Sequence, residues 1–148
     1  MDTTHYQAPG WATRHLANPL MMILTRLGLS ARGSRVLETK GRRSGLPRRT
    51  PVNLLTLDGV DYLVAPRGET EWVRNVRADG GRLTLRLGRR ARDRVADEVP
   101  VDERVPLLRE YLRRWKAETS VFFGGVGPDA SDAELAAIAG RHPVFRLR

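Results

Sequence analysis

Residues 52–65 read VNLLTLDGVDYLVA, two runs typical of β-strands that flank Asp58-Gly59. An Asp-Gly pair between two such runs is a strong signal for a two-residue hairpin turn, because both positions must adopt a positive φ. Apolar and polar side chains alternate strictly over residues 83–87, LTLRL, which predicts a further strand that is buried on one face. These segments indicate a domain that is built around an antiparallel sheet.

Further strand signals surround this hairpin. Val36-Leu37 begins a strand that enters a turn rich in glycine and proline at residues 41–47. Residues 91–99 predict another strand, and residues 144–147 predict a final edge strand. About five strands thus follow one another with a single short helix between them. This order favours a small antiparallel barrel or sheet with helices around it over a parallel fold of alternating strands and helices.

Four helices are expected around the sheet. They begin at Asn18-Pro19, at Thr70 as an N-cap, at Asp102 and at the capping box of Ser131. The first of them carries the apolar run Leu20–Leu29, which has one broad apolar face. We expect this face to pack on the sheet; contact with a membrane surface is the alternative.

Length and composition fit one globular domain. The chain has 148 residues, of which 41% are hydrophobic and 29% charged. It contains no cysteine, which excludes disulfides, thiolate metal sites and cysteine nucleophiles. Its first residues lack the pattern of a signal peptide, and no run approaches the ~18 apolar residues that span a bilayer. A cytoplasmic protein is expected, with membrane association through residues 20–29 left open.

Positive charge is concentrated in two segments. The chain carries 26 basic and 17 acidic residues, a formal charge of +9, and only two of the basic residues are lysines. Residues 32–49 hold seven basic residues against Glu38, and residues 82–94 hold six against Asp93. Arginine offers a rigid fork of donors that suits phosphate and carboxylate. The sequence therefore predicts an anionic ligand.

Several kinds of catalytic site find no support in the sequence. His5, His15 and His142 lie far apart without metal-ligand spacing, so no metal site is expected, and solvated or capping histidines are the favoured interpretation. The glycines at positions 41 and 45 are not followed by the lysine and hydroxyl of a P-loop, nor do they open a helix as a dinucleotide fingerprint does. No serine lies in a nucleophile-elbow motif.

Two other segments combine glycine, arginine and hydroxyl groups. Residues 39–51, TKGRRSGLPRRTP, allow backbone N–H groups and arginine forks to approach one ligand. Residues 65–75, APRGETEWVRN, bring a strand end, a tight loop and a helix N-terminus together, which attracts anions, and Trp72 adds a large apolar surface. A solvated basic turn and an ordinary core tryptophan are the respective alternatives.

The chain resembles the deazaflavin (F420)-dependent nitroreductase family, whose fold is the split β-barrel of flavin reductases. The likeness covers about residues 35–114 and rests on four features in order: Gly41-Arg42-Arg43-Ser44-Gly45-x-Pro47-Arg48-x-Thr50-Pro51, the Gly59 hairpin, Ala65-x-x-Gly68, and Trp72-x-x-Asn75-x-x-Ala78. It implies an α+β, mainly β domain over residues 1–148. About six antiparallel strands would be surrounded by three or four helices, with residues 1–33 as an N-terminal helical extension.

The resemblance also implies the cofactor, coenzyme F420, with FMN less favoured. The first segment would hold its phosphate and polyglutamate tail, and the second would flank the deazaflavin ring. The cofactor-binding residues implied are Lys40, Gly41, Arg42, Arg43, Ser44, Gly45, Arg48, Arg49, Thr50, Pro51, Ala65, Pro66, Arg67, Gly68, Trp72 and Asn75.

The activity implied is transfer of a hydride from reduced F420 to an electrophilic hydrophobic acceptor, such as a quinone, an enone, an activated alkene or a nitroaromatic. Nitro-prodrug reductases of the family carry a serine where this chain has Pro66, and C-terminal tyrosines where it has Phe122 and Phe123. Proline offers no hydrogen-bond donor, so the pocket is expected to be more apolar than theirs. Tyr62, Tyr111 and solvent are candidate proton donors.

Two other functions are alternatives to an F420-dependent reductase. The same barrel could bind a fatty acid or another hydrophobic anion without turnover. A nucleic-acid binder is disfavoured, since aromatic residues make up only 6% of the chain and do not alternate with the basic ones. The partners expected are therefore a small hydrophobic substrate and no specific nucleic acid, with peripheral membrane contact through the N-terminal helix and the choice between monomer and homodimer left open.

Overall fold

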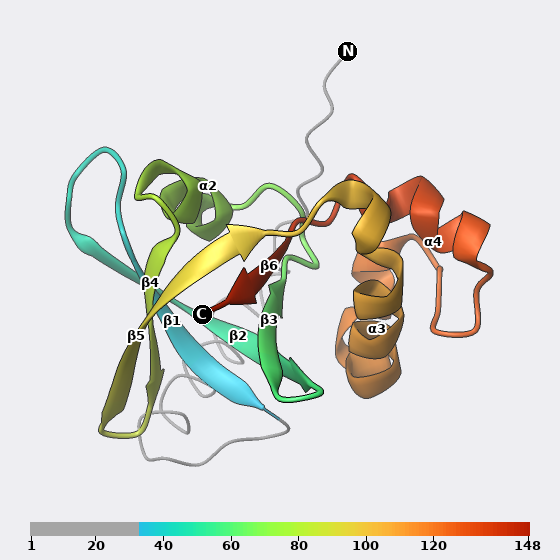
Figure 1. Ribbon diagram of the computed structural model, residues 1–148, viewed down its shortest axis with the longest axis horizontal. Helices are drawn as coiled ribbons and strands as arrows, with labels where there is room; N and C mark the ends of the chain where they lie inside the picture. The colour runs from blue at the N-terminus through green and yellow to red at the C-terminus, as the bar shows by residue number, and fades with distance from the viewer. Residues whose placement is uncertain (1–32) are drawn as a thin grey trace.

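The computed structural model describes residues 33–148, so the expected helix over Leu20–Leu29, the rest of the N-terminal extension, His5 and His15 lie outside the described part. Six antiparallel strands close into a barrel in the order β1-β2-β3-β6-β5-β4, as Figure 1 shows. This confirms the expected mainly β split barrel. The strands are β1 (Ser34–Lys40), β2 (Pro47–Leu57), β3 (Val60–Val64), β4 (Arg82–Leu87), β5 (Arg90–Glu98) and β6 (Val144–Leu147).

The Asp-Gly turn is confirmed between β2 and β3. Asp58 and Gly59 have φ values of 52° and 77°, the left-handed values that this hairpin turn requires. The long strand β2 is shared by two partners: residues 47–53 pair with β1, and residues 54–57 pair with β3. One strand therefore connects two parts of the barrel wall.

The sequence predicted an edge strand over residues 144–147, and this was wrong: strand β6 lies inside the barrel wall. It pairs with β3 through residues 144–147 and with β5 through residues 145–147, and it thereby closes the barrel. A run of four residues typical of a strand indicates that a strand is present but not how many neighbours it has. Closure depends on pairing between residues more than 45 positions apart, which no local pattern encodes.

Helix α2 (Glu71–Ala78) covers one end of the barrel, next to the loop between β1 and β2 (Figure 1). Its Val73 and Val76 join the barrel core. Gly81 follows the helix at a φ of 88°, and a Cβ at this position would lie 2.3 Å from the carbonyl oxygen of Ala96. Only glycine therefore allows β5 to approach the end of this helix so closely.

A second apolar core lies between the barrel wall and the C-terminal helices. It contains Leu55 and Val64 from the barrel and a row of buried residues on α3 (Val105–Thr119), with Leu135 from α4 (Asp132–Ala139). The Ser131 capping box of α4 is confirmed. Asp102, expected to begin a helix, lies in the 3-10 turn η2 (Val101–Glu103), and the α-helix begins at Val105. Within residues 33–148, no helix is both long enough and apolar enough to span a bilayer.

His142 was expected to be solvated or capping, and the structure corrects this. The residue is 1% exposed and stacks on Phe123 with ring centroids 4.2 Å apart. Its Nδ1 lies 3.2 Å from the carbonyl oxygen of Ala65, at the start of the loop that precedes α2. His142 therefore joins that loop to the 3-10 turn η3 (Ser120–Phe123).

A chain of ion pairs links the barrel to the helical layer. Arg104 is 4% exposed, donates to the carbonyl oxygens of Val99 (2.9 Å) and Ala139 (3.0 Å), and pairs with Glu98 at 3.1 Å. Glu98 also pairs with Arg77 of α2 at 2.7 Å. Arg77 in turn pairs with Glu69, which lies in the loop before α2. This chain of charges, Glu69–Arg77–Glu98–Arg104, fixes α2 and its preceding loop against the start of the helical layer.

We expect Glu98 to make stability depend on pH in the acid range. Hydrogen bonding to Arg77 is the main cause that lowers the pKa of Glu98 below its ordinary value of 4.5. A carboxylate with a lowered folded-state pKa stabilises the protein above its unfolded pKa, and this contribution is lost as the pH falls. Glu98→Gln should therefore lower the free energy of unfolding by about 1–2 kcal/mol at neutral pH. This loss should become smaller as the pH drops below 4.5, the ordinary pKa of the carboxyl group.

Urea unfolding of the wild type and Glu98→Gln, repeated from neutral pH into the acid range, measures the difference in their free energies of unfolding. Glu103→Gln is the control, because Glu103 is exposed and has no ion pair among the described residues. The free energy of unfolding of this control should differ little from that of the wild type at every pH. A Glu98→Gln difference that stays constant through the acid range would contradict the prediction.

Candidate functional site

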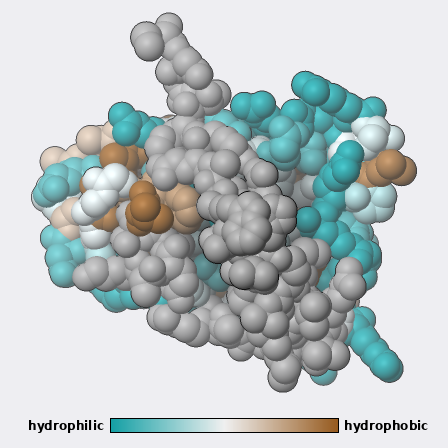
Figure 2. Space-filling view, turned by 180° about the vertical axis from the view of Figure 1, so that it is seen from behind, coloured by the Kyte–Doolittle hydropathy of each residue, from teal (hydrophilic) through white to brown (hydrophobic). Residues whose placement is uncertain are grey.

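A cavity of about 830 Å³ lies between the arginine loop, which we define as residues 41–49, the N-terminus of α2 and the helical layer. Figure 2 shows a mostly hydrophilic surface on the side of the molecule that carries this loop. Residues from four separated segments line the cavity: Ser34, Thr39, Gly41, Arg42, Arg43, Ser44, Arg48, Arg49, Thr50, Pro51, Val52, Asn53, Val64, Pro66, Arg67, Thr70, Glu71, Trp72, Asn75, Tyr111 and Phe122.

The arginine loop holds its shape through its own backbone. The N–H of Gly41 donates to the carbonyl oxygen of Leu46, and the N–H of Gly45 donates to that of Gly41, each at 2.8 Å. Gly45 has a φ of 73°, while a Cβ on Gly41 would lie 2.8 Å from the Ser44 hydroxyl. The two glycines predicted to shape this turn are therefore both required by it.

Asn75 ties the loop to α2. This residue is 3% exposed, and its Oδ1 accepts hydrogen bonds from the backbone N–H of Arg42 at 3.2 Å and from its guanidinium at 3.0 Å. Its Nδ2 donates to the Thr39 hydroxyl at 3.4 Å. The bonds of Asn75 are thus used within the protein, so this residue positions the loop.

Replacing Asn75 by alanine should leave buried groups of Arg42 and Thr39 without partners. We expect the free energy of unfolding to fall by about 1–3 kcal/mol, the usual cost of an unsatisfied buried polar group. Asn75→Asp keeps the acceptor for Arg42 and should retain most of the stability. Urea unfolding of both variants checks this, and equal losses would show that the Arg42 bonds are not what matters.

Two of the loop arginines already have carboxylate partners. Arg42 pairs with Glu71 at 2.6 Å, and this bond lowers the pKa of Glu71. Arg49 pairs with Glu38 at 2.7 Å and lowers the pKa of that carboxyl, which Arg86 also contacts. By contrast, Arg43 and Arg48 are exposed and have no ion pair within residues 33–148. These two guanidiniums are available to an anionic ligand.

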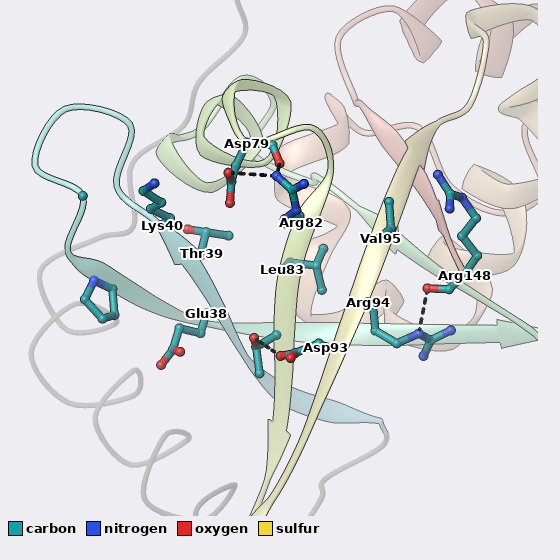
Figure 3. Close-up of a pocket in the computed structure, with 13 residues that line it drawn as sticks. Glu38, Thr39, Lys40, Asp79, Arg82, Leu83, Asp93, Arg94, Val95 and Arg148 are labelled. Carbon is teal, nitrogen blue, oxygen red and sulfur yellow. Dashed lines mark hydrogen bonds and ion pairs between the residues drawn. The ribbon is translucent and has the colours of Figure 1, made fainter.

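Lys40 and Gly45 line a different pocket, of about 550 Å³, between the end of β1 and the start of β4. Figure 3 shows Lys40 and Thr39 on one side of this pocket and Asp79, Arg82, Arg94 and Arg148 around the rest. Each of its arginines has an acidic partner: Asp79 for Arg82, Asp61 for Arg94 and Asp97 for Arg148. Most of the positive charge in this second pocket is therefore already paired with carboxylates, so the pocket is poorly suited to an anion.

Aromatic side chains also line the main cavity. Tyr111 is 2% exposed, and its hydroxyl accepts a hydrogen bond from Asn53 Nδ2 at 3.5 Å. The Cζ atom of Arg67 lies 5.1 Å from the centroid of the Phe122 ring. Trp72 packs against the barrel core, with its ring centroid 5.7 Å from that of Phe145. Cationic and aromatic side chains therefore line the same cavity.

Thr70 occupies the N-cap position of α2 but does not cap the helix with its side chain. Its Oγ1 is buried and has no hydrogen-bond partner among the described residues. Buried hydroxyls are normally satisfied, so an unsatisfied one in the wall of a cavity points to a ligand. Sequence reasoning missed this role, because a threonine before a helix is the expected signal for a cap.

The structure brings twelve of the sixteen implied cofactor residues together in the main cavity. The other four are Lys40 and Gly45, which line the second pocket, and Ala65 and Gly68, which form a buried turn behind the wall with an N–H to carbonyl bond of 3.1 Å. Of the two tyrosines considered as proton donors, Tyr111 lines the cavity. Tyr62 packs instead against the helical core.

The arrangement fits an elongated ligand with an anionic end and a planar end. The guanidiniums of Arg43 and Arg48, without an ion pair in the described part of the chain, suit phosphate and carboxylate groups, and aromatic walls with a buried hydroxyl suit a polar ring. Coenzyme F420 has this division of chemistry, and the residues present are compatible with it.

Comparison with known proteins points the same way. The sequence profile of the F420H(2)-dependent quinone reductase family matches residues 9–126. No curated protein sequence matches the chain.

Solved structures share the fold at low sequence identity. An F420-H2 dependent reductase, FDR-A, is 21% identical, with 79% of this chain and 95% of that chain covered and a TM-score of 0.54. A protein described as a domain-swapped dimer is 19% identical over 88% and 94% of the two chains, with a TM-score of 0.57. A protein of unknown function from Agrobacterium tumefaciens is 18% identical over 95% and 58%, with a TM-score of 0.55.

Proposed function

Since the chain belongs to the F420H(2)-dependent quinone reductase family and is therefore an oxidoreductase that uses coenzyme F420, we propose that it reduces small hydrophobic acceptors. The acceptors proposed are quinones, enones and other activated alkenes, with nitroaromatics as a further class. The observation that carries this proposal is one cavity lined both by aromatic side chains and by two exposed arginines, Arg43 and Arg48, that have no ion pair within residues 33–148.

Two groups of residues that line the cavity have different roles in this proposal. Arg43 and Arg48 bind the phosphate and the carboxylates of the cofactor tail, because both are exposed and neither has an ion pair within residues 33–148. Trp72 and Thr70 flank the ring, the first by apolar contact and the second through its unsatisfied hydroxyl. When bound in its reduced form, the coenzyme supplies a hydride, and the protein contributes orientation and exclusion of water.

Tyr111 is the proposed source of a proton for the reduced acceptor, alongside solvent. Tyr111 lines the cavity and its hydroxyl accepts a hydrogen bond from Asn53, which places a phenol, a group that can give up a proton, in the cavity wall. Pro66 lines the same cavity without a side-chain donor. This lack of a donor agrees with an acceptor end that is more apolar than in nitroreductases.

We also infer a homodimer, on the support of the domain-swapped dimer among the structural neighbours. Light scattering at several protein concentrations tests this, since the chain mass is 16.6 kDa. A mass that stays at this value at every concentration would contradict the inference.

Titration with F420 beside FMN, followed by ring fluorescence, tests the cofactor site directly. Binding of F420 that is at least tenfold tighter than that of FMN is expected, on the order of a 1.4 kcal/mol preference. Oxidation of reduced F420 with quinones, enones and nitroaromatics then ranks the acceptors. Lipid in the purified protein without F420 binding would instead favour a non-catalytic protein that binds hydrophobic anions.

A further inference from the structure

The N-terminus of α2 borders the main cavity and has no capping side chain. Thr70, Glu71 and Trp72, which form this helix end, all line the cavity. Thr70 occupies the N-cap position with φ −83° and ψ 173°, but its side chain makes no cap hydrogen bond. The first N–H groups of a helix have no partner within the helix, and they form the positive end of its dipole. This end of α2 therefore offers donors and a positive field beside the cavity.

The hydroxyl is the one polar group of Thr70 without a partner in the described part of the chain. The Thr70 N–H donates to the carbonyl oxygen of Gly68 at 2.8 Å, and its carbonyl oxygen accepts from the N–H of Arg74 at 3.2 Å. Its Oγ1 is buried and unsatisfied. Because no hydrogen bond holds this rotamer, a turn about the Cα–Cβ bond to another staggered position can direct the hydroxyl into the cavity. There it can donate to an oxygen of a ligand.

The two carboxylates that flank Thr70 in the chain are already neutralised. Glu71 pairs with Arg42 at 2.6 Å, and Glu69 pairs with Arg77. Neither carboxylate is therefore left to cancel the positive field of the helix end. This field favours an oxygen that carries negative charge. A single hydroxyl suits one carbonyl oxygen, whereas a phosphate is better matched by guanidinium forks such as those of the arginine loop.

We propose that Thr70 and the first turn of α2 form an oxyanion site, which binds the carbonyl oxygen of an acceptor in which this oxygen is conjugated with the carbon that receives the hydride. This rests on the proposed reductase function and adds Thr70 to it as a catalytic residue. An acceptor must lie against the coenzyme ring to receive a hydride, so a group that flanks the ring also flanks the acceptor. Quinones and enones both carry such an oxygen.

The reduction step balances with these groups. The acceptor carbon forms a C–H bond with both electrons of the hydride, and the electron pair of the broken π bond moves onto the carbonyl oxygen. The coenzyme is oxidised by two electrons, and a proton from Tyr111 or solvent then completes the reduction. Negative charge on the oxygen is greatest before the proton arrives. The Thr70 hydroxyl and the positive end of α2 therefore stabilise the transition state more than the bound acceptor.

Thr70→Val tests the hydroxyl, because valine has a similar volume but no donor. With menadione and cyclohexenone as acceptors, kcat should fall about tenfold to a hundredfold, while KM should change less than about twofold. Thr70→Ser keeps the hydroxyl and should retain most of kcat. Thr56→Val is the matched control and should keep the wild-type kcat, because the Thr56 hydroxyl donates to Asp61 at 2.6 Å and does not line the cavity.

Binding of 4-nitrophenol to the coenzyme-free protein gives a readout without turnover. The ionised oxygen of this planar phenol resembles the charge that develops on the acceptor, and the ionised form absorbs visible light. At a pH at which the free compound is half ionised, binding should increase this absorbance, because an oxyanion site favours the ionised form. In Thr70→Val the Kd should be about tenfold higher and the increase smaller, whereas Thr56→Val should match the wild type.

Thermal unfolding of the ligand-free protein separates the two hydroxyls. Thr70→Val should melt at or above the wild-type temperature, because this variant loses no hydrogen bond. Thr56→Val should melt below it, since Asp61 loses a donor. A clear decrease in the melting temperature of Thr70→Val would show that its hydroxyl already has a partner, and this would overturn the proposal.

The remaining outcomes separate the oxyanion site from the proposed function. An unchanged kcat in Thr70→Val with both acceptors overturns the site and leaves the proposed function intact. A higher Kd for F420 with unchanged kcat also overturns it, since the hydroxyl would then serve the coenzyme alone. If 4-nitrophenol binding depends on Thr70 but no quinone or enone oxidises reduced F420 in the wild type, the oxyanion site stands and the proposed function fails.

Discussion

Replacing Arg104 by leucine should lower the free energy of unfolding by about 3–5 kcal/mol, as expected when one member of a buried, hydrogen-bonded ion pair is removed. Its guanidinium reaches three carbonyl oxygens, on Val99, Ala139 and His142, in addition to the carboxylate of Glu98. Leucine fills part of the volume but offers no donor. The buried carbonyls would then lack partners, and each such group is costly in a low-dielectric interior.

The matched control lies on α3, the helix that begins directly after Arg104. Arg113 is 59% exposed, and among the described residues its one ion pair is with Glu110 of the preceding turn, so Arg113→Leu should change stability by less than about 1 kcal/mol. Arg104→Lys keeps the charge but cannot reach three acceptors in a fixed fork, and should recover less than half of the loss. Urea unfolding of the three variants measures these losses of stability. Similar losses in Arg104→Leu and Arg113→Leu would show that burial of this network contributes little.

Arg104 also shows where sequence reasoning stops. Its position just before a helix resembles that of many surface arginines, and its role depends on Ala139, 35 residues away. The Asp58-Gly59 hairpin and the Ser131 capping box were predictable because their signals lie within four residues. Burial of His142 and closure of the barrel by β6 depend on distant partners, so no local pattern could have indicated them.

The candidate site, too, could be predicted from the sequence only in part. The sequence identifies the arginine loop as a concentration of charge, but it does not show which charges are already neutralised. Arg42 and Arg49 have partners on α2 and β1, and Lys40 lines another pocket. Composition counts these three residues equally with Arg43 and Arg48. Only the folded arrangement reduces the loop to two arginines that have no ion pair among the described residues.

The Arg43→Ala, Arg48→Ala double variant should therefore bind F420 about a hundredfold more weakly than the wild type at low salt. A hydrogen bond to a charged group contributes about 1.5–3 kcal/mol, and the lower value applies here because both side chains are exposed. That value corresponds to about tenfold in Kd for each residue. Arg49→Ala alone should weaken binding less than about fivefold, since Arg49 is held by Glu38.

Two controls make this effect specific to the cofactor tail. Arg89→Ala with Arg90→Ala removes the same net charge from the exposed β4–β5 turn and should leave the Kd for F420 within about twofold. A truncated deazaflavin without phosphate and glutamates should bind the wild type and the Arg43, Arg48 variant equally, because it lacks the groups that these arginines would contact. If the truncated compound loses affinity in the double variant as F420 does, the arginines act through the shape of the loop. If Arg49→Ala weakens F420 binding as much as the double variant, the ion pair with Glu38 opens on binding, and this carboxylate does not keep Arg49 from the ligand.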